Sequence, residues 1–336
     1  MHMKKSYYLF NPGRLSRKDN TLKFVPVDEN GQEGTPRFLP IEGIQNCFVF
    51  GSLDVNSAVL NFLGREGVNL HFFDYYEHYT GSYMARDYLL AGQMQIKQTE
   101  AYLQPTRRLA LARTLVEGAA FNMLKNLRYY GGRGRDFGPL IERIEGYQAL
   151  IPQSEDVQAL MGIEGNIRNA YYESFEEIMP GFVWGERSRQ PPRNELNVLV
   201  SFGNMLCYTL CLDQIHHTQL NPTVSFLHEP GARRYSLALD LAEIFKPILV
   251  DRLIFKVINK KILQPKDFDH QVQQWRLKDG ARKAFVKHWE ERLSETIQHR
   301  SLGRKVSYRH LVRLEAYKLA KDLLGAQPYS PFKAWW

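Results

Sequence analysis

The stretch of residues 221–247 combines a histidine, the closely spaced carboxylates of Asp240 and Glu243, and several basic side chains. His228 follows a short apolar run and precedes Glu229-Pro230-Gly231, so we expect it at the end of ordered structure, beside a loop. Asp240 and Glu243 are three residues apart, which places both carboxylates on one face of a helix. Carboxylate and imidazole donors suit Mg²⁺ or Mn²⁺ better than structural zinc. Taken alone, the pattern also fits an ordinary charged helix with a nearby histidine.

A third carboxylate, Glu164, lies at the margin of an apolar helical stripe and between two glycines. The stripe consists of Leu160, Ile163, Ile167 and Tyr171. A glycine inside a helix costs about 1 kcal/mol relative to alanine, and a site that needs close approach to the backbone would explain Gly162 and Gly165. The alternative is that Glu164 only pairs with Arg168 one turn later on a solvated face. The segment by itself leaves both interpretations open.

Basic side chains accompany these carboxylates and could contact phosphate. One group surrounds the acidic helix, and another precedes a helix that begins at Asn194. The two groups are Arg233, Arg234 and Lys246, and Arg187, Arg189 and Arg193. The alternative for the second group is a solvated linker. Asn197 and Asn204 share one apolar helical face, where a buried amide usually bonds to backbone.

The positive charge is concentrated in the second part of the chain. The 336 residues carry a net charge of +8. Residues 1–80 contain 8 basic and 9 acidic side chains, and the remainder contains 36 and 27. A basic lobe attracts polyanions, above all nucleic acid. The alternative is that the charge serves solubility alone.

The sequence pattern predicts an α+β protein, with a β-rich domain over residues 1–85 and a larger all-helical domain over residues 86–336. Stretches rich in Val, Phe and Tyr between turn residues predict strands at 6–10, 21–27, 36–40, 47–51, 69–74 and 79–84. One helix among them is expected to be capped by Ser52 and ended by Gly67. Helical periodicity then predicts a long helix over 88–130 that breaks at Gln104-Pro105, followed by helices at 136–150, 155–178, 194–217, 236–262, 268–298 and 308–325.

Membrane insertion and disulfide bonding are not expected. The sequence has no run of about 18 apolar residues, the length that a membrane span needs. Its three cysteines are Cys47, Cys207 and Cys211, an odd number without metal-type spacing. We therefore expect reduced core cysteines in a cytoplasmic protein.

Three segments, in this order, resemble the CRISPR-associated integrase family, the universal first protein of spacer acquisition. The matching residues are Glu164-Gly165 with Arg168 and Tyr172; Arg189, Arg193 and Asn197 leading into Leu199-Val200-Ser201-Phe202-Gly203; and Phe226-Leu227-His228, Ser236-Leu237, Leu239-Asp240-Leu241, Glu243 and Phe245-Lys246-Pro247. The family often has glycine at the position of Ser225 and arginine at that of Lys246. Lysine acts as a point charge, so it cannot recognise phosphate in a bidentate manner.

The resemblance implies that Glu164, His228 and Glu243 bind a divalent metal, Mg²⁺ or Mn²⁺. Asp240 would be a fourth catalytic carboxylate, either an accessory ligand or a partner of a ligand. The expected DNA contacts are Arg168, Arg189, Arg193, Arg233, Arg234 and Lys246.

The implied reaction is phosphoryl transfer, in which the 3′-hydroxyl of a new DNA fragment attacks the CRISPR repeat, and water in its place gives cleavage of linear or branched double-stranded DNA. The resemblance also implies a homodimer formed through the β domain. Two such dimers would be bridged by a small ferredoxin-like CRISPR-associated partner into a heterohexamer. Two other functions remain open: a non-catalytic DNA-binding protein, and a metal-dependent hydrolase of small substrates.

Overall fold

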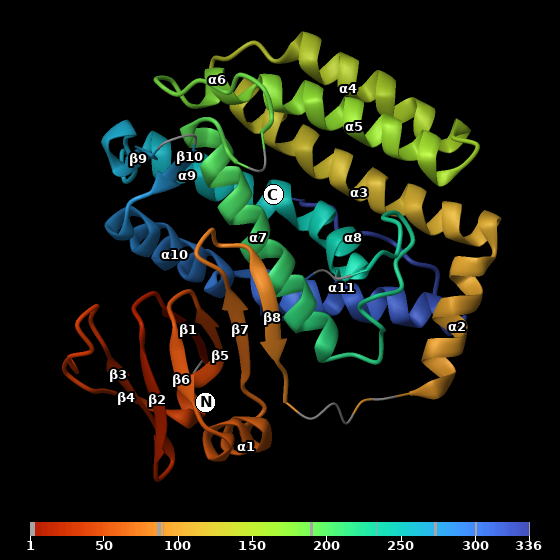
Figure 1. Cartoon of the computed structure of the whole chain (residues 1–336). Coiled ribbons are helices and arrows are strands. Elements are labelled where there is room, and N and C mark those ends of the chain that lie inside the picture. Colours follow the sequence, from red (N-terminus) through yellow and green to blue (C-terminus); the bar gives the residue numbers. More distant parts are fainter. Residues whose placement is uncertain are drawn as a thin grey trace. The chain divides into compact units, whose positions relative to one another are not determined.

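The chain forms two compact units, Met1–Leu90 and Ala91–Trp336 (Figure 1). The computed structural model describes residues 4–85, 89, 91–188, 191–232, 234–271, 274–299 and 301–335. The first unit is rich in strands and the second is mainly helical. The predicted α+β class, with strands first and helices after them, is therefore confirmed.

The first unit contains two four-stranded sheets. In one sheet the order is β1 (Lys5–Leu9), β5 (Ile44–Val49), β7 (Asn69–Phe73) and β8 (Tyr79–Tyr83), and only the β7–β8 pair is antiparallel. In the other the order is β4 (Arg37–Pro40), β3 (Thr21–Pro26), β2 (Gly13–Lys18) and β6 (Leu53–Val55), and β2 pairs with β6 in parallel. The sequence pattern did not predict β2 and β6; β2 forms a local hairpin with β3, whereas β6 pairs with a segment about forty residues away.

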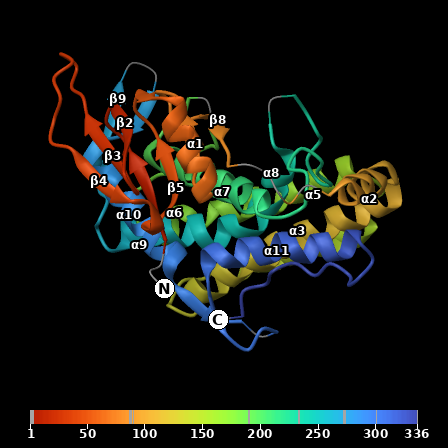
Figure 2. The same ribbon diagram turned by 90° about the horizontal axis from the view of Figure 1, so that it is seen from below.

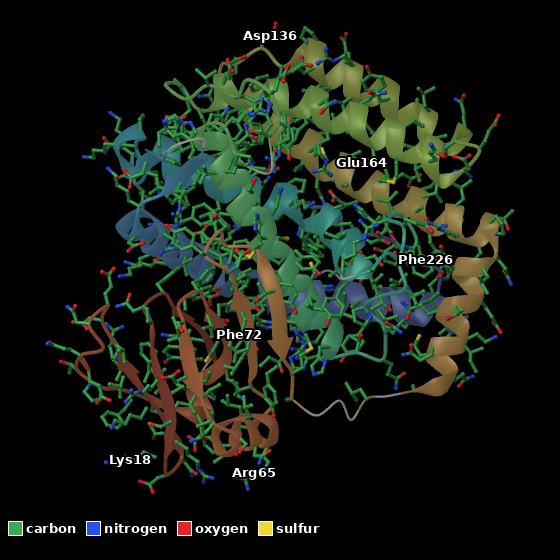
Figure 3. The ribbon with its side chains drawn as sticks, in the orientation of Figure 1. Lys18, Arg65, Phe72, Asp136, Glu164 and Phe226 are labelled. Atoms are coloured by element: carbon green, nitrogen blue, oxygen red, sulfur yellow. The ribbon has the colours of Figure 1, made fainter. Side chains whose placement is uncertain are left out.

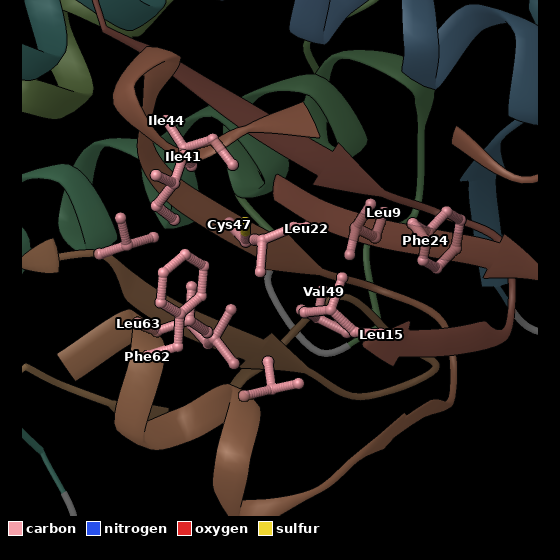
Figure 4. Packing of buried hydrophobic residues seen from close by; sticks show 13 residues of the cluster. Leu9, Leu15, Leu22, Phe24, Ile41, Ile44, Cys47, Val49, Phe62 and Leu63 are labelled. Atoms are coloured by element: carbon pink, nitrogen blue, oxygen red, sulfur yellow. The ribbon is translucent and has the colours of Figure 1, made fainter. Parts of the chain in front are cut away.

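Apolar side chains of both sheets and of helix α1 (Ser57–Glu66) form one core (Figure 4). Leu22, Val49 and Phe62 are among its fully or almost fully buried members. Gly67 ends α1 in a left-handed conformation, as predicted, with φ of +69°. The cap prediction was wrong: the side chain of Asn56, and not Ser52, accepts the hydrogen bond from Val59 N–H, because β6 lies between Ser52 and the helix.

The second unit consists of helices with two small hairpins. Its helices are α2 (Gly92–Leu103), α3 (Pro105–Gly131), α4 (Gly138–Leu150), α5 (Val157–Glu173), α6 (Phe175–Ile178), α7 (Glu195–His216), α8 (Ser236–Phe245), α9 (Arg252–Asn259), α10 (Asp279–Ser294) and α11 (Tyr308–Leu323). A π-helical turn, Lys246–Asp251, joins α8 to α9. The hairpins are β9 (Phe268–Gln271) with β10 (Gln274–Leu277), and β11 (Thr296–Gln298) with β12 (Lys305–Ser307). Short 3₁₀ turns occupy Ile151–Gln153 and Pro265–Asp267 in this unit, and Ile41–Gly43 in the first unit.

Helix α7 lies in the middle of the second unit, with α8 and α11 packed along it (Figures 1 and 2). Its Gly203 allows close approach of the π-helical turn, since a Cβ atom there would lie 2.4 Å from Cγ1 of Val250. Among the described residues α7 alone is long and apolar enough to cross a membrane, and 78% of its most apolar window is buried inside the protein. Cys207 and Cys211 on this helix are buried free thiols, as predicted.

One predicted helix was wrong. Residues 268–298 form the β9–β10 hairpin first, and α10 begins only at Asp279. Phe268 pairs with Leu277 across the hairpin, and both side chains are buried. This cross-strand contact outweighs the helical pattern of the surrounding charged residues.

Candidate active site

Three segments of the helical unit bring the predicted acidic residues together. Helix α5 supplies Glu164 and Arg168, the loop before α8 supplies His228, and α8 supplies Asp240 and Glu243. Figure 3 labels Glu164 on α5 and Phe226 in the loop. Arg168 and Glu243 are 75 positions apart in the sequence, and only the packing of the helices brings them together.

Arg168 is the link between α5 and α8. Its guanidinium donates to Glu164 Oε1 through Nε at 2.7 Å, and a terminal nitrogen donates to Glu243 Oε2. The Arg168 and Glu243 side chains are only 14% and 7% exposed, so water screens this pair weakly. Glu164 therefore does pair with Arg168 four residues later, as the alternative interpretation of the sequence predicted. The same arginine also donates to the carboxylate of Glu243.

Asp240 holds the loop that carries His228. Its fully buried carboxylate accepts hydrogen bonds from the backbone N–H groups of Phe226 and Leu227, at 2.7 and 3.0 Å, and of His228, at 2.9 Å. The same carboxylate lies 2.9 Å from Nδ1 of the His228 ring. Each oxygen thus has two partners. With Nδ1–H directed at Asp240, the lone pair of Nε2 is available for another ligand.

Glu243 lies at the electrostatic centre of the cluster. Its Oε1 accepts from Lys246 Nζ at 2.5 Å and lies 3.9 Å from His228 Nε2. Burial alone would raise the pKa of Glu243, but the charges of Arg168 and Lys246 outweigh burial and lower the pKa to about 2. Burial by itself would lower the pKa of Arg168. The negative charges of Glu164 and Glu243 outweigh this effect of burial, so the pKa of Arg168 lies well above its usual value.

The donor atoms of this cluster fit a hard divalent ion. In the part of the chain that the structure describes, no three His, Cys, Asp or Glu side chains form a ready cluster for a metal. The reason is visible in the contacts, since Arg168 takes up carboxylate oxygens of both Glu164 and Glu243. Two carboxylates and a ring nitrogen fixed by Asp240 are nevertheless suitable donors for Mg²⁺ or Mn²⁺.

Packing within the protein does not explain the glycines beside Glu164. A Cβ atom at Gly162 or Gly165 would meet nothing within 4 Å among the described atoms. Close packing within the protein therefore does not require glycine there, and close approach of a ligand remains a prediction.

The predicted phosphate-contacting residues have different surroundings. Lys246 is largely buried against Glu243, whereas the side chains of Arg193 and Arg234 are exposed. Arg234 donates to the carbonyl of Glu229. Arg189 and Arg233 lie outside the described residues.

The other segment singled out in the sequence positions a loop. Asn197 is buried, its Oδ1 accepts from Ser188 N–H at 3.0 Å, and its Nδ2 donates to the Glu186 carbonyl at 2.9 Å. Arg187 also donates to this amide oxygen. The amide thus bonds to backbone, as buried amides usually do.

The sequence did not reveal the buried groups beneath the cluster. Asp251, at the end of the π-helical turn, interacts with the hydroxyl of Tyr171, and burial raises its pKa to about 7. Asn126 donates to the same hydroxyl at 2.8 Å and to the Pro247 carbonyl at 2.8 Å. Asp251, Asn126 and Tyr171 come from three different helical segments, and only tertiary packing brings them together. No local sequence pattern therefore predicts their contact.

Structural comparison places the chain among CRISPR-associated proteins. A solved Cas1 protein from Thermotoga maritima superposes with a TM-score of 0.85 at 36% identity, over 98% of this chain and 100% of that one. A casposase bound to an integration product also has a TM-score of 0.85, over 98% of this chain and 93% of that one. Its 18% identity shows a shared fold alone.

Sequence comparison agrees over the full length. The family described as CRISPR associated protein Cas1 matches residues 7–291. A relative from Moorella thermoacetica, named CRISPR-associated endonuclease Cas1 2, is 46% identical over 332 residues, covering 99% of this chain and 100% of the relative. The chain therefore belongs to the Cas1 family.

Proposed function

We propose that the chain is a divalent-metal-dependent DNA integrase and endonuclease that inserts new spacers into a CRISPR array. The observation that supports this proposal best is the convergence of Glu164, His228 and Glu243 with two cations in the basic helical unit. Membership of a family whose curated relatives are named endonucleases agrees with it. The same points favour an enzyme over a passive DNA-binding protein.

In this proposal, each residue of the cluster has one task. Glu164, His228 and Glu243 hold the ion, and Asp240 keeps the His228 ring in the orientation that exposes Nε2. Arg168 and Lys246 are placed to meet phosphate oxygens when they leave their carboxylate partners. When bound, a divalent ion polarises a phosphoryl oxygen and stabilises the charge that develops on it.

The proposed reaction joins a new DNA fragment to the repeat. The 3′-oxygen of the fragment bonds to a phosphorus atom of the array, and the phosphorus–oxygen bond of the repeat strand breaks. The attacking hydroxyl loses a proton and the departing 3′-oxygen gains one. Water at the same position as the attacking hydroxyl gives hydrolysis, so cleavage and integration share one site.

Chelation and a modified DNA end test the proposal together. We expect a labelled fragment with a 3′-hydroxyl to join a CRISPR repeat in Mg²⁺ or Mn²⁺, and joining to stop in EDTA or when the fragment ends in a 3′-deoxy sugar. Joined products on a sequencing gel measure the outcome. Joining that survives EDTA would remove the metal from the mechanism. DNA binding without any joining or cleavage would favour the non-catalytic alternative.

The proposal extends to partners and location. The exposed Arg193 and Arg234, with Arg189 and Arg233, are candidates for contacts with double-stranded and branched DNA. We propose a cytoplasmic homodimer formed through the first unit. A small ferredoxin-like CRISPR-associated partner would bridge two such dimers into a heterohexamer.

A truncation tests the role of the first unit. A chain that begins at Ala91 retains every residue of the acidic cluster. We expect it to be monomeric by sedimentation, to bind Mn²⁺ in a calorimetric titration, and to lose paired integration at two strands. Circular dichroism confirms that its helices remain. A dimeric truncation would place the interface in the helical unit, and a folded one without Mn²⁺ binding would show that the first unit completes the site.

A further inference from the structure

One cavity of the helical unit lies outside the acidic cluster. It has a volume of about 930 Å³ and is bounded by the end of α3, by α9, by the end of α10 and by the first residue of α11. Neither the carboxylates of the cluster nor His228, Arg168 or Lys246 line it. Its size is in the range of ligand pockets, which is about 300–1,000 Å³.

The walls of the cavity carry a large excess of positive charge. Six cationic side chains line it among the described residues: Arg133, Arg135, Arg252, Lys256, Lys260 and Arg292. Glu295 is the one carboxylate of that lining, and Arg292 already pairs with it. The structure therefore gathers cations here without matching anions from the lining.

Two of these cations, Arg252 and Arg292, repel each other electrostatically. Arg252 is largely buried and donates through Nε to Asn126 Oδ1 at 2.7 Å. Burial lowers the pKa of Arg252, and the neighbouring charge of Arg292 lowers it further. The Arg292 side chain is 15% exposed, and its Nε has no hydrogen-bond partner among the described residues. An anionic ligand beside the two guanidinium groups would relieve this repulsion.

Aromatic rings alternate with these cations. The Arg133 guanidinium lies 4.5 Å from the centre of the Tyr129 ring, and that of Arg292 lies 3.9 Å from the centre of the Tyr308 ring. Tyr129 lines the cavity and is 49% exposed, so part of this residue remains accessible to a ligand. Guanidinium groups and tyrosine rings side by side can bind phosphates and stack on bases at the same time.

This combination favours an unpaired strand over a duplex. In a duplex the base faces are covered by their neighbours, so they cannot stack on a protein ring. An extended single strand exposes both its phosphates and its base faces. A cavity lined by a partly exposed tyrosine and by cations suits one or two such nucleotides.

We propose that this cavity is a binding site for single-stranded DNA, with a base stacked on Tyr129 and phosphates bound by Lys256, Lys260 and the buried arginines. The inference rests on the proposed function only in taking DNA as the substrate. Binding here does not use the acidic cluster or a metal ion.

Binding of a labelled oligodeoxythymidylate in EDTA, followed by fluorescence anisotropy, tests the proposal. We expect Tyr129→Ala to weaken single-strand binding by roughly 5- to 150-fold, the range for loss of one stacked base. Tyr129→Phe keeps the ring and should bind like the unmodified protein. A duplex of the same length should respond little to either substitution. Thermal unfolding verifies that both variants are folded.

Charge removal gives an independent measurement. Lys256→Ala/Lys260→Ala should lower the slope of log affinity against log salt by about 1.4, since each lost contact with a single strand contributes about 0.7. The matched control is Lys283→Ala/Lys287→Ala, which also removes two lysines one turn apart on an exposed helical face. An equal effect in the control would mean that the cavity has no special role.

Three further results would overturn the proposal: unchanged binding by Tyr129→Ala, equal weakening of duplex and single strand, or competition by free thymidine monophosphate at the concentration of the oligonucleotide. The last would indicate a site for a free nucleotide. Because these measurements contain EDTA, they are independent of the metal chemistry. If the protein bound the single strand as expected but did not carry out the proposed integrase reaction, the proposed function would be wrong and the assignment of the cavity would still hold.

Discussion

Replacing Glu243 with glutamine is expected to reduce metal-dependent cleavage and strand transfer by more than about 100-fold while the protein stays folded. Partners of a ligand alone contribute about 10- to 100-fold to metal affinity or activity, so loss of the ligand should cost more. Glutamine is the better test than alanine, because it fills the space between Arg168 and Lys246, which Glu243→Ala would leave empty and unpaired. His228→Ala should have a similar effect on both activities.

Turnover of labelled DNA and calorimetric titration of Mn²⁺ measure these variants. The control is Glu173→Gln on the same helix as Glu164, because Glu173 is exposed and pairs with Arg143 away from the cluster. It should retain full activity. If Glu243→Gln or His228→Ala kept near-normal rates and metal affinity at saturating Mn²⁺, the assigned ligand set would be wrong.

The Glu243 carboxylate also predicts a pH dependence of stability. Its folded pKa of about 2 lies below the usual glutamate value of 4.5, so the ionised form stabilises the fold. That stabilisation is fully present above the unfolded pKa and disappears as the pH falls from about 4.5 to about 2. Glu243→Gln should lack this component, which denaturant unfolding at several acidic pH values can measure.

Asp240→Ala is expected to lower the free energy of unfolding by about 3–5 kcal/mol, the range for breaking a buried charged contact. The substitution leaves three backbone N–H groups and the His228 ring without their acceptor in a fully buried place. The loop that carries His228 should then become disordered, and Mn²⁺ affinity should fall together with stability.

A second capping carboxylate provides the comparison. Asp156 caps α5 at an exposed position and accepts one hydrogen bond, from Ala159 N–H at 2.7 Å. Asp156→Ala should cost about 1 kcal/mol in urea unfolding, as helix caps usually do. Equal losses in the two variants would contradict the structural role of Asp240. Full stability with complete loss of Mn²⁺ binding would instead make Asp240 a direct ligand.

The sequence was most informative where the signal is local. Periodicity predicted a helix over 308–325 that the structure has at Tyr308–Leu323, and proline marked the break between α2 and α3. The spacing of Asp240 and Glu243 predicted one shared face, and both carboxylates do reach the His228 ring. Such features depend on neighbours within one or two turns, which the sequence displays directly.

Features that depend on distant pairing were beyond such reasoning. Strand β6 exists because Leu53–Val55 pairs with β2, some forty residues earlier in the chain. The bond between Arg168 and Glu243 joins helices that the sequence does not place side by side. The roles of Asp251 and Asn126 follow from the same packing, so no local pattern could have revealed them.

The π-helical turn Lys246–Asp251 sets the rotation between Glu243 before it and Arg252 after it. An α-helix turns through about 100° and rises about 1.5 Å for each residue. A π-helical turn is wider, because its hydrogen bonds join residues five positions apart and each turn therefore holds more residues. Deleting a single codon here would swing Arg252 and Lys256 around the helix axis while α8 kept its register. The acidic cluster and the cavity lined by Arg252 and Lys256 would keep all their side chains, but the two sites would no longer be aligned with each other. In-frame changes of length are therefore the mutations that this part of the gene should tolerate least, even where point substitutions are accepted.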